Sequence, residues 1–181
     1  LAQAQPLLKA WSAVLSGTPT AQKLIEAVPD ELRTPGYLFI RIKALRKANR
    51  LSAAAELMLD APDTADALID LRAWWTERRL LARNLFDAGK VRLAYEVVSS
   101  HGAEAPADRA DAEFVAGWYA LRGLDDPKAA EAHFSRIESL AEGAITRARA
   151  FYWSGRAADA AGDARAEKFF EEAARYGTTF Y

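Results

Sequence analysis

Apolar residues recur at helical spacing along the whole chain, and short turn sequences separate the segments that they define. Thr34 and Pro35 can begin a helix as N-cap and first helical residue, Asn49-Arg50 can end it, and Ser52 can cap the next one. Similar turns follow at Ala88-Gly89, Asp125-Asp126-Pro127 and Ala161-Gly162-Asp163. The pattern predicts helices at 3–15, 20–28, 35–48, 52–60, 64–88, 91–100, 107–123, 127–140, 144–161 and 163–176.

Two columns of residues repeat with a period of 36. A small residue occupies the first column and a large apolar residue follows four positions later: Ala94 and Val98, Ala130 and Phe134, Ala166 and Phe170. A looser copy lies upstream, with Ala54 in the small column. A small residue lets two helices approach, and the large residue fills the gap to the next hairpin. The period predicts a tetratricopeptide-like solenoid of helical hairpins that forms an irregular superhelix.

Composition supports an all-α fold. The 181 residues include 40 alanines but only 12 valines and isoleucines, so the strongest helix former dominates and strand formers are scarce. We expect one α-superhelical domain over residues 1–181, with repeats near 36–60, 68–100, 107–140 and 144–176.

Several functional classes lack support in the sequence. Charges interrupt every apolar run, so no membrane span is expected, and neither a glycine-rich phosphate loop nor a metal-ligand spacing occurs. We therefore expect no metal, no cofactor and no nucleic-acid partner. Lys43, Lys47 and Arg50 form a basic stripe that fits either an anionic partner or a solvated outer face.

Candidate acid–base residues are few. Glu77 follows two tryptophans and precedes Arg78 and Arg79, which favours a structural ion pair over a catalytic acid. His133 is interpreted as a partly buried packing residue and His101 as a partner of a helix C-terminus. No residue of the chain is predicted to be catalytic.

Tryptophan and arginine recur together in the first helix of the last three repeats, with the arginine three or four residues after the tryptophan. Such pairs can stack on sugar rings or peptides and bind carboxylates, although tryptophans also build solenoid cores. One member of each adjacent aromatic pair can be core while the other reaches a groove. The binding candidates are Trp75, Arg78, Arg79, Trp118, Arg122, Trp153 and Arg156.

The same residues carry a resemblance to a known family. Tyr152-Trp153-x-Gly155-Arg156-Ala157 with Thr179-x-Tyr181 resembles the last helical repeat of the soluble lytic murein transglycosylases. Upstream, the segments similar to the family's superhelical part are Trp74-Trp75-x-Glu77-Arg78-Arg79, Ala94-Tyr95, Gly117-Trp118-x-Ala120-Leu121-Arg122 and His133-Phe134. The likeness covers roughly residues 36–181.

The resemblance implies a periplasmic enzyme that cleaves peptidoglycan glycan strands and leaves 1,6-anhydromuramoyl ends. In that family the catalytic glutamate belongs to a lysozyme-like domain that begins shortly after the Thr-x-Tyr motif, so such a domain is expected after residue 181. The helical part then supports the catalytic domain and holds peptidoglycan weakly on its concave face, as a monomer. The alternative is a tetratricopeptide-like scaffold that binds a protein or peptide.

Overall fold

A computed structural model describes residues 4–68, 70–141 and 143–177. These residues form ten α-helices and one 3-10 turn, and they contain no strand, so the all-α prediction is confirmed. The helices are α1 (Gln5–Ser16), α2 (Ala21–Glu26), α3 (Pro35–Lys47), α4 (Leu51–Leu59), α5 (Leu71–Asp87), α6 (Val91–Ser99), α7 (Pro106–Gly123), α8 (Pro127–Leu140), α9 (Ala144–Ala160) and α10 (Ala166–Ala174), with the 3-10 turn η2 at Asp30–Leu32.

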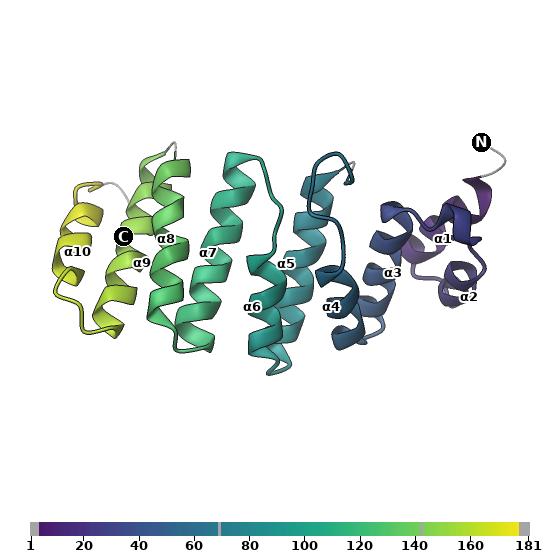
Figure 1. The fold of residues 1–181 in the computed structure, drawn as a ribbon, viewed down its shortest axis with the longest axis horizontal. Helices are drawn as coiled ribbons and strands as arrows, with labels where there is room; N and C mark the ends of the chain where they lie inside the picture. Colours follow the sequence, from purple (N-terminus) through teal and green to yellow (C-terminus); the bar gives the residue numbers. More distant parts are fainter. Residues whose placement is uncertain (1–3, 69, 142, 178–181) are drawn as a thin grey trace.

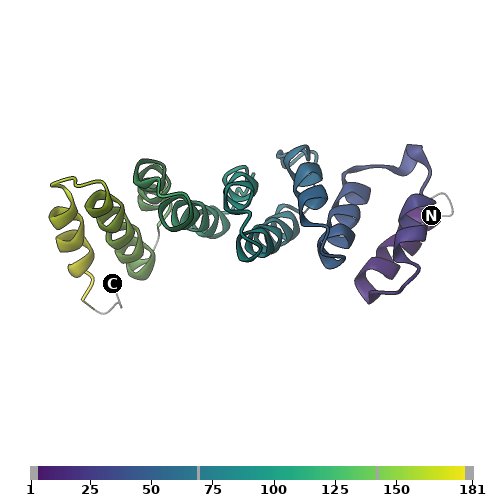
Figure 2. The same cartoon turned by 90° about the horizontal axis from the view of Figure 1, so that it is seen from below.

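The helices stand side by side in one elongated row, with α1 and α10 at opposite ends (Figure 1). Viewed along the other direction, α3, α5 and α7 lie along one side of the row, and α4, α6 and α8 along the other (Figure 2). We call α3, α5, α7 and α9 the first helices, and α4, α6, α8 and α10 the second helices. Each of the four predicted repeat ranges holds one first helix and one second helix.

The turns between hairpin partners fall where the sequence indicates them. Asn49, Gly89, Asp125 and Gly162 all have left-handed backbone conformations, with φ of 57°, 75°, 53° and 68°. Glycine, asparagine and aspartate tolerate this conformation better than other residues, which explains why these residue types mark the turns.

Two helices begin several residues later than predicted, and near each observed start an aspartate side chain accepts a backbone N–H. The long helix expected at 64–88 begins only at Leu71, where Asp70 accepts the N–H of Ala73 (2.9 Å). The helix expected at 163 begins at Ala166, since Asp163 accepts the N–H of Arg165 (2.9 Å). Ser52 caps nothing: α4 already begins at Leu51, and the Ser52 hydroxyl is bound by Lys90.

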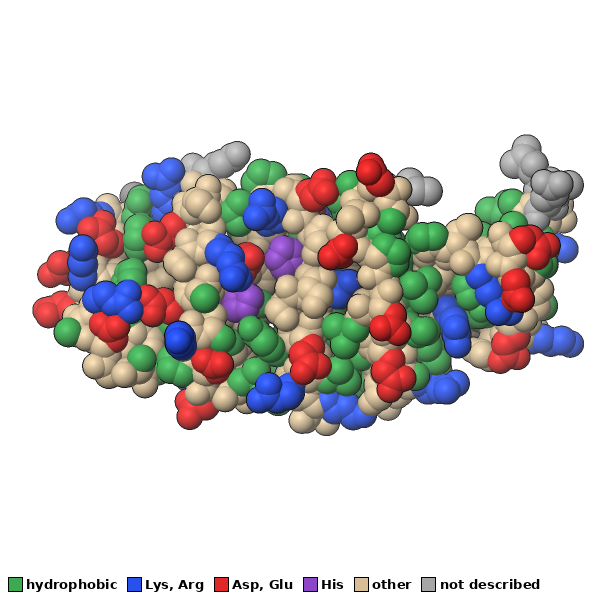
Figure 3. Space-filling view, viewed as in Figure 1, with side chains coloured by type: hydrophobic (Ala, Val, Ile, Leu, Met, Phe, Trp, Pro, Cys, Tyr) green, Lys and Arg blue, Asp and Glu red, His purple; other side chains and the backbone are tan. Residues whose placement is uncertain are grey.

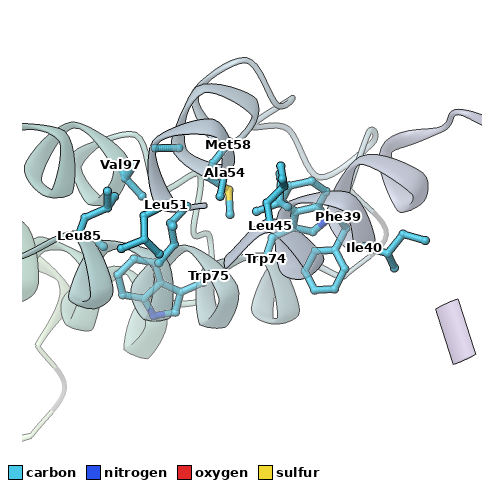
Figure 4. Close-up of a cluster of buried hydrophobic side chains, with 14 of the residues drawn as sticks. Phe39, Ile40, Leu45, Leu51, Ala54, Met58, Trp74, Trp75, Leu85 and Val97 are labelled. Carbon is cyan, nitrogen blue, oxygen red and sulfur yellow. The ribbon is translucent and has the colours of Figure 1, made fainter. Parts of the chain in front are cut away.

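The hydrophobic core runs from one hairpin into the next as two clusters, both of which include residues of α7. Figure 4 shows the part between α3 and α6, where Phe39 and Trp74 meet edge to face with their ring centroids 5.1 Å apart. Trp75, Leu85 and Val97 continue the same cluster. Each hairpin therefore buries apolar side chains against its neighbours as well as between its own two helices.

The two columns of the repeat are buried except at the end of the row. Ala94, Ala130, Val98 and Phe134 are fully enclosed, whereas Ala166 and Phe170 of the last hairpin are only partly buried. A close approach accompanies the large column, because a Cβ added to Gly117 would lie 2.6 Å from the ring of Phe134. Gly117 thus makes room for the large residue opposite it.

We expect Ala130→Leu to lower the free energy of unfolding by about 2 kcal/mol, because Ala130 has no exposed surface and a larger side chain must displace its neighbours. Chemical denaturation followed by circular dichroism measures the change. Ala132→Leu is the matched control, because Ala132 lies on the same helix at an exposed position. A denaturation midpoint unchanged in Ala130→Leu would contradict the packing described here.

Candidate functional groove

The structure separates the seven predicted binding residues into interior and surface positions. Trp75 and Arg78 are buried, with 3% of each residue exposed. Arg79 and Arg122 are exposed, and Trp118, Trp153 and Arg156 are partly exposed. Only the last five are accessible to a ligand on the surface of this fold.

Trp75 connects two first helices. Its indole Nε1–H donates to Asp111 Oδ2 of α7 (3.1 Å), and the same oxygen accepts a bond from Arg79 Nη1 (2.8 Å). Asp111 follows Trp75 by 36 residues, so the bond joins equivalent positions of neighbouring repeats. Trp75 therefore forms a hydrogen bond that joins α5 to α7. Arg79 binds the same oxygen of Asp111, and its side chain is exposed at the surface.

Arg78 holds the ends of two second helices. It donates to the carbonyl oxygens of Val97 in α6 (3.0 Å) and Met58 in α4 (3.2 Å). These carbonyls lie in the last turns of their helices, where partners within the helix are lacking. Burial lowers the pKa of Arg78 to about 10, while the charge of Asp63 acts in the opposite direction. The guanidinium therefore remains charged at neutral pH, and its hydrogen bonds hold α4 and α6 together.

A groove of about 410 Å³ lies between α5 and α7 on the side of the first helices. Its lining residues are Arg79, Leu80, Arg83, Phe114, Val115, Trp118 and Tyr119. Two guanidinium groups thus face a wall of aromatic rings, and the ring of Trp118 is supported from behind by Phe86, with centroids 5.5 Å apart. The groove can stack on a flat sugar or peptide surface and donate hydrogen bonds at its edge.

The aromatic wall continues from α7 to α9. The ring of Phe114 contacts Trp153 edge to face at 5.9 Å, and the guanidinium carbon of Arg149 lies 4.4 Å from the centroid of Phe114. Arg156 follows on α9 and donates to the hydroxyl of Tyr152 (3.2 Å). The repeat pattern pointed to Trp153 and Arg156, whereas Arg149 was not among the predicted residues.

Glu77 forms the predicted ion pair, but with different partners. It is buried and binds Arg46 and Lys43 of α3, with Arg46 Nη2 at 3.1 Å and Lys43 Nζ at 3.4 Å, rather than Arg78 or Arg79. Lys47 of the basic stripe donates to the carbonyl of Val14 at the end of α1 (2.7 Å). Two of the three stripe residues therefore connect helices, which neither interpretation of the stripe anticipated.

A second buried carboxylate escaped the sequence interpretation. Glu113 of α7 accepts bonds from His133 Nδ1 (2.6 Å), Arg136 Nη1 (3.1 Å) and His101 Nε2 (3.5 Å). The Tyr95 hydroxyl lies 3.1 Å from the other nitrogen of His133. We call these five residues the Glu113 cluster; its two histidines are visible side by side in purple in Figure 3. Glu113 follows Glu77 by 36 residues, and that spacing was the available signal.

The electrostatics of the Glu113 cluster oppose general-acid chemistry. Burial on its own raises the pKa of Glu113, but the hydrogen bonds from His101, His133 and Arg136 outweigh it and hold the pKa well below its usual range. A carboxylate that stays ionised only accepts hydrogen bonds, so His133 donates from Nδ1, and its Nε2 shares a hydrogen bond with the Tyr95 hydroxyl. The cluster joins the loop after α6 to α7 and α8.

A larger, mainly apolar pocket of about 550 Å³ lies toward the N-terminal end of the row. Trp11, Phe39 and Trp74 contribute its aromatic rings, and Asp70 stands at its lining. Across the described residues no group of three metal-ligating side chains is found, and no described helix has the length and hydropathy of a membrane span.

Comparison of the chain with family models, with curated proteins and with solved structures finds no match.

Proposed function

We propose that this chain is the noncatalytic helical part of a periplasmic peptidoglycan lytic transglycosylase, and that the groove between α5 and α7 holds a glycan–peptide strand. The observation that carries the proposal is the composition of the groove. Trp118, partly exposed, stands in it with Arg79 and Arg83 from the neighbouring first helix. Aromatic rings bind the apolar faces of sugars, and guanidinium groups bind the carboxylates of stem peptides.

We further propose that the row of hairpins is a tetratricopeptide-like solenoid. The 36-residue columns and the alternation of first and second helices support this arrangement. An elongated row of this kind offers a long binding surface to a polymer while each hairpin contacts only its neighbours. In the full protein such a surface would position peptidoglycan for a catalytic domain.

The groove between α5 and α7 has residues that can bind a glycan–peptide strand but no carboxylate that could act as an acid catalyst. Its lining contains no carboxylate, although glycosidic bond cleavage in this family needs a glutamate whose proton is available. Glu77 lies in a buried ion pair, and the pKa of Glu113 is shifted in the wrong direction for an acid. These features favour a binding role for this part of the protein. Reading the gene beyond Tyr181 for a lysozyme-like domain tests the enzymatic half of the proposal.

The second candidate is a scaffold that binds a protein or peptide partner. The pocket beside Trp11, Phe39 and Trp74 favours it, because an apolar, aromatic pocket of this size suits a large hydrophobic side chain. That pocket lacks the guanidinium groups of the α5–α7 groove. It therefore suits an apolar ligand, whereas the groove suits a ligand with carboxylates.

We expect soluble disaccharide–peptide fragments of peptidoglycan to bind the chain with a Kd of about 0.1–1 mM, which corresponds to roughly 4–5.5 kcal/mol. Chemical shifts in an NMR titration should change at Trp118 and Arg83, on the first-helix side. Trp118→Leu should weaken binding by about two- to tenfold through the loss of ring stacking.

Two controls make the titration decisive. Arg92 is an exposed residue of the second helix α6, so Arg92→Gln should leave the Kd unchanged. Circular dichroism at the titration temperature verifies that Trp118→Leu is folded. Absence of shift changes at Trp118 with millimolar fragment would refute the proposed peptidoglycan groove, and shifts confined to Trp11 and Trp74 would favour the scaffold.

A further inference from the structure

Helix α9 carries positive charge that no carboxylate of the described residues neutralises. It contains Arg147, Arg149 and Arg156, and within residues 4–68, 70–141 and 143–177 none of them forms an ion pair with a carboxylate. Basic residues of the first helices α3 and α5, by contrast, do form such pairs. Lys43 and Arg46 of α3 pair with Glu77, and Arg72 and Arg79 of α5 pair with Asp108 and Asp111.

Two of the three arginines share one side of α9. Arg149, Trp153 and Arg156 are spaced by four and three residues, which places them on a single stripe. At a rise of 1.5 Å per residue, the two arginines stand about 10 Å apart along the helix. Arg147 is engaged elsewhere, because its Nε donates to the carbonyl of Ala141 at the end of α8 (3.1 Å).

Arg149 is held in place without an acceptor. Its guanidinium stacks against the ring of Phe114 at 4.4 Å, and its buried Nε has no hydrogen-bond partner in the part of the chain that the structure describes. Arg149 is partly exposed, so a ligand on the surface can reach its guanidinium group. A positioned arginine that lacks an acceptor matches a ligand that supplies oxygen atoms.

We propose that this stripe is a carboxylate subsite for the stem peptide of peptidoglycan. Arg149 and Arg156 bind two carboxylates of the extended peptide, and the half-buried ring of Trp153 supports the apolar atoms between them. Guanidinium groups are donors only and fit carboxylates in a forked geometry, whereas the neutral hydroxyls of a glycan need no positive partner. The inference rests on the proposed peptidoglycan function and adds a second position for peptide carboxylates on α9, beyond the guanidinium groups of the α5–α7 groove.

The test uses a synthetic stem tetrapeptide with free carboxylates and the same peptide with every carboxylate amidated. We expect the free acid to bind and the amidated peptide to bind at least about tenfold more weakly, since hydrogen bonds to charged groups are the strong ones. Arg149→Gln should weaken binding of the free acid by about tenfold, and raised salt should weaken it further. Arg92→Gln removes the same charge from a second helix and should have no effect.

Arg149→Lys separates charge from geometry and also serves if the glutamine variant folds poorly. It keeps the charge but loses the fork, so an affinity between those of the wild type and Arg149→Gln is expected. Equal affinities for the free and amidated peptides, or an Arg149→Gln Kd equal to that of wild type, would overturn the subsite. Disaccharide–peptide fragments that still shift Trp118 in that case would leave the proposed function intact. Failure of those fragments, with Arg149-dependent binding of the free acid, would instead refute the groove alone.

Discussion

Phe134→Ala should lower the free energy of unfolding by about 3–5 kcal/mol, the range expected when a fully buried phenylalanine leaves a cavity. Phe134 has no exposed surface, and its ring lies against Gly117 of α7 as well as Phe114 and Trp153. The ring therefore joins α8 to both neighbouring first helices. Denaturant unfolding followed by circular dichroism gives the difference in free energy.

Phe170→Ala is the matched control, since Phe170 occupies the same column one repeat later. Phe170 is only partly buried because α10 is the last helix of the row, and a Cβ on Gly155 would meet its ring as closely as one on Gly117 meets Phe134. We expect a loss of about 1 kcal/mol, as less apolar surface is removed from contact. Equal decreases in the free energy of unfolding for Phe134→Ala and Phe170→Ala would contradict the expectation that the inner phenylalanine contributes more than the one at the end of the row.

The parts of the fold that follow from local sequence were predictable. The turn at Asn49 needs a left-handed residue, and the columns at Ala94 and Ala130 need small side chains, so residue type alone identified both. The helix at 64–88 was drawn too long because Asp70, which caps α5, lies inside a segment with helical spacing. The capping bond that fixes where α5 begins is not visible in the spacing of apolar residues.

The candidate site was predictable only in part, because its roles depend on partners far along the chain. Glu77 was expected to pair with the arginines beside it, yet its partners come from 31 and 34 residues earlier. Arg78 and Arg79 are adjacent in sequence, but one is enclosed between second helices and the other borders the groove. Helical rotation of about 100° per residue separates such neighbours, and only tertiary packing determines which one faces solvent.

Two kinds of arginine therefore coexist in the row. Arg46 and Arg78 join neighbouring helices and have partners that the fold itself supplies. Arg83 and Arg149 lie beside the aromatic wall of the first helices, where Arg83 has only a distant carboxylate at 3.9 Å and Arg149 has none within the described residues. The first kind of arginine stabilises the array, and the second kind is available to a ligand. Replacing Arg149 should therefore weaken ligand binding more than it lowers the free energy of unfolding.

The Glu113 cluster provides the second large effect on stability. Glu113→Gln keeps the shape of the side chain and one acceptor oxygen but removes the charge that faces His101, His133 and Arg136. We expect the free energy of unfolding to fall by about 3 kcal/mol at pH 7, because hydrogen bonds to a charged group contribute roughly 1.5–3 kcal/mol each and only part of them survives. Arg136→Gln, at the exposed edge of the cluster, should lower the free energy of unfolding by less than about 1 kcal/mol.

The pH dependence of that difference identifies its cause. The pKa of Glu113 is lower in the folded chain than in the unfolded chain, where it lies near 4.5, since the hydrogen bonds outweigh the effect of burial. The stabilisation from its charge is therefore complete above about pH 4.5 and declines as the pH falls below that value, because the unfolded chain takes up the proton first. The glutamine variant has no such group, so the gap between wild type and Glu113→Gln should narrow steadily from pH 4.5 to pH 3. A gap that stays constant over this interval would mean that Glu113 contributes through shape and neutral hydrogen bonds, and that its carboxylate charge does not hold the hairpins together.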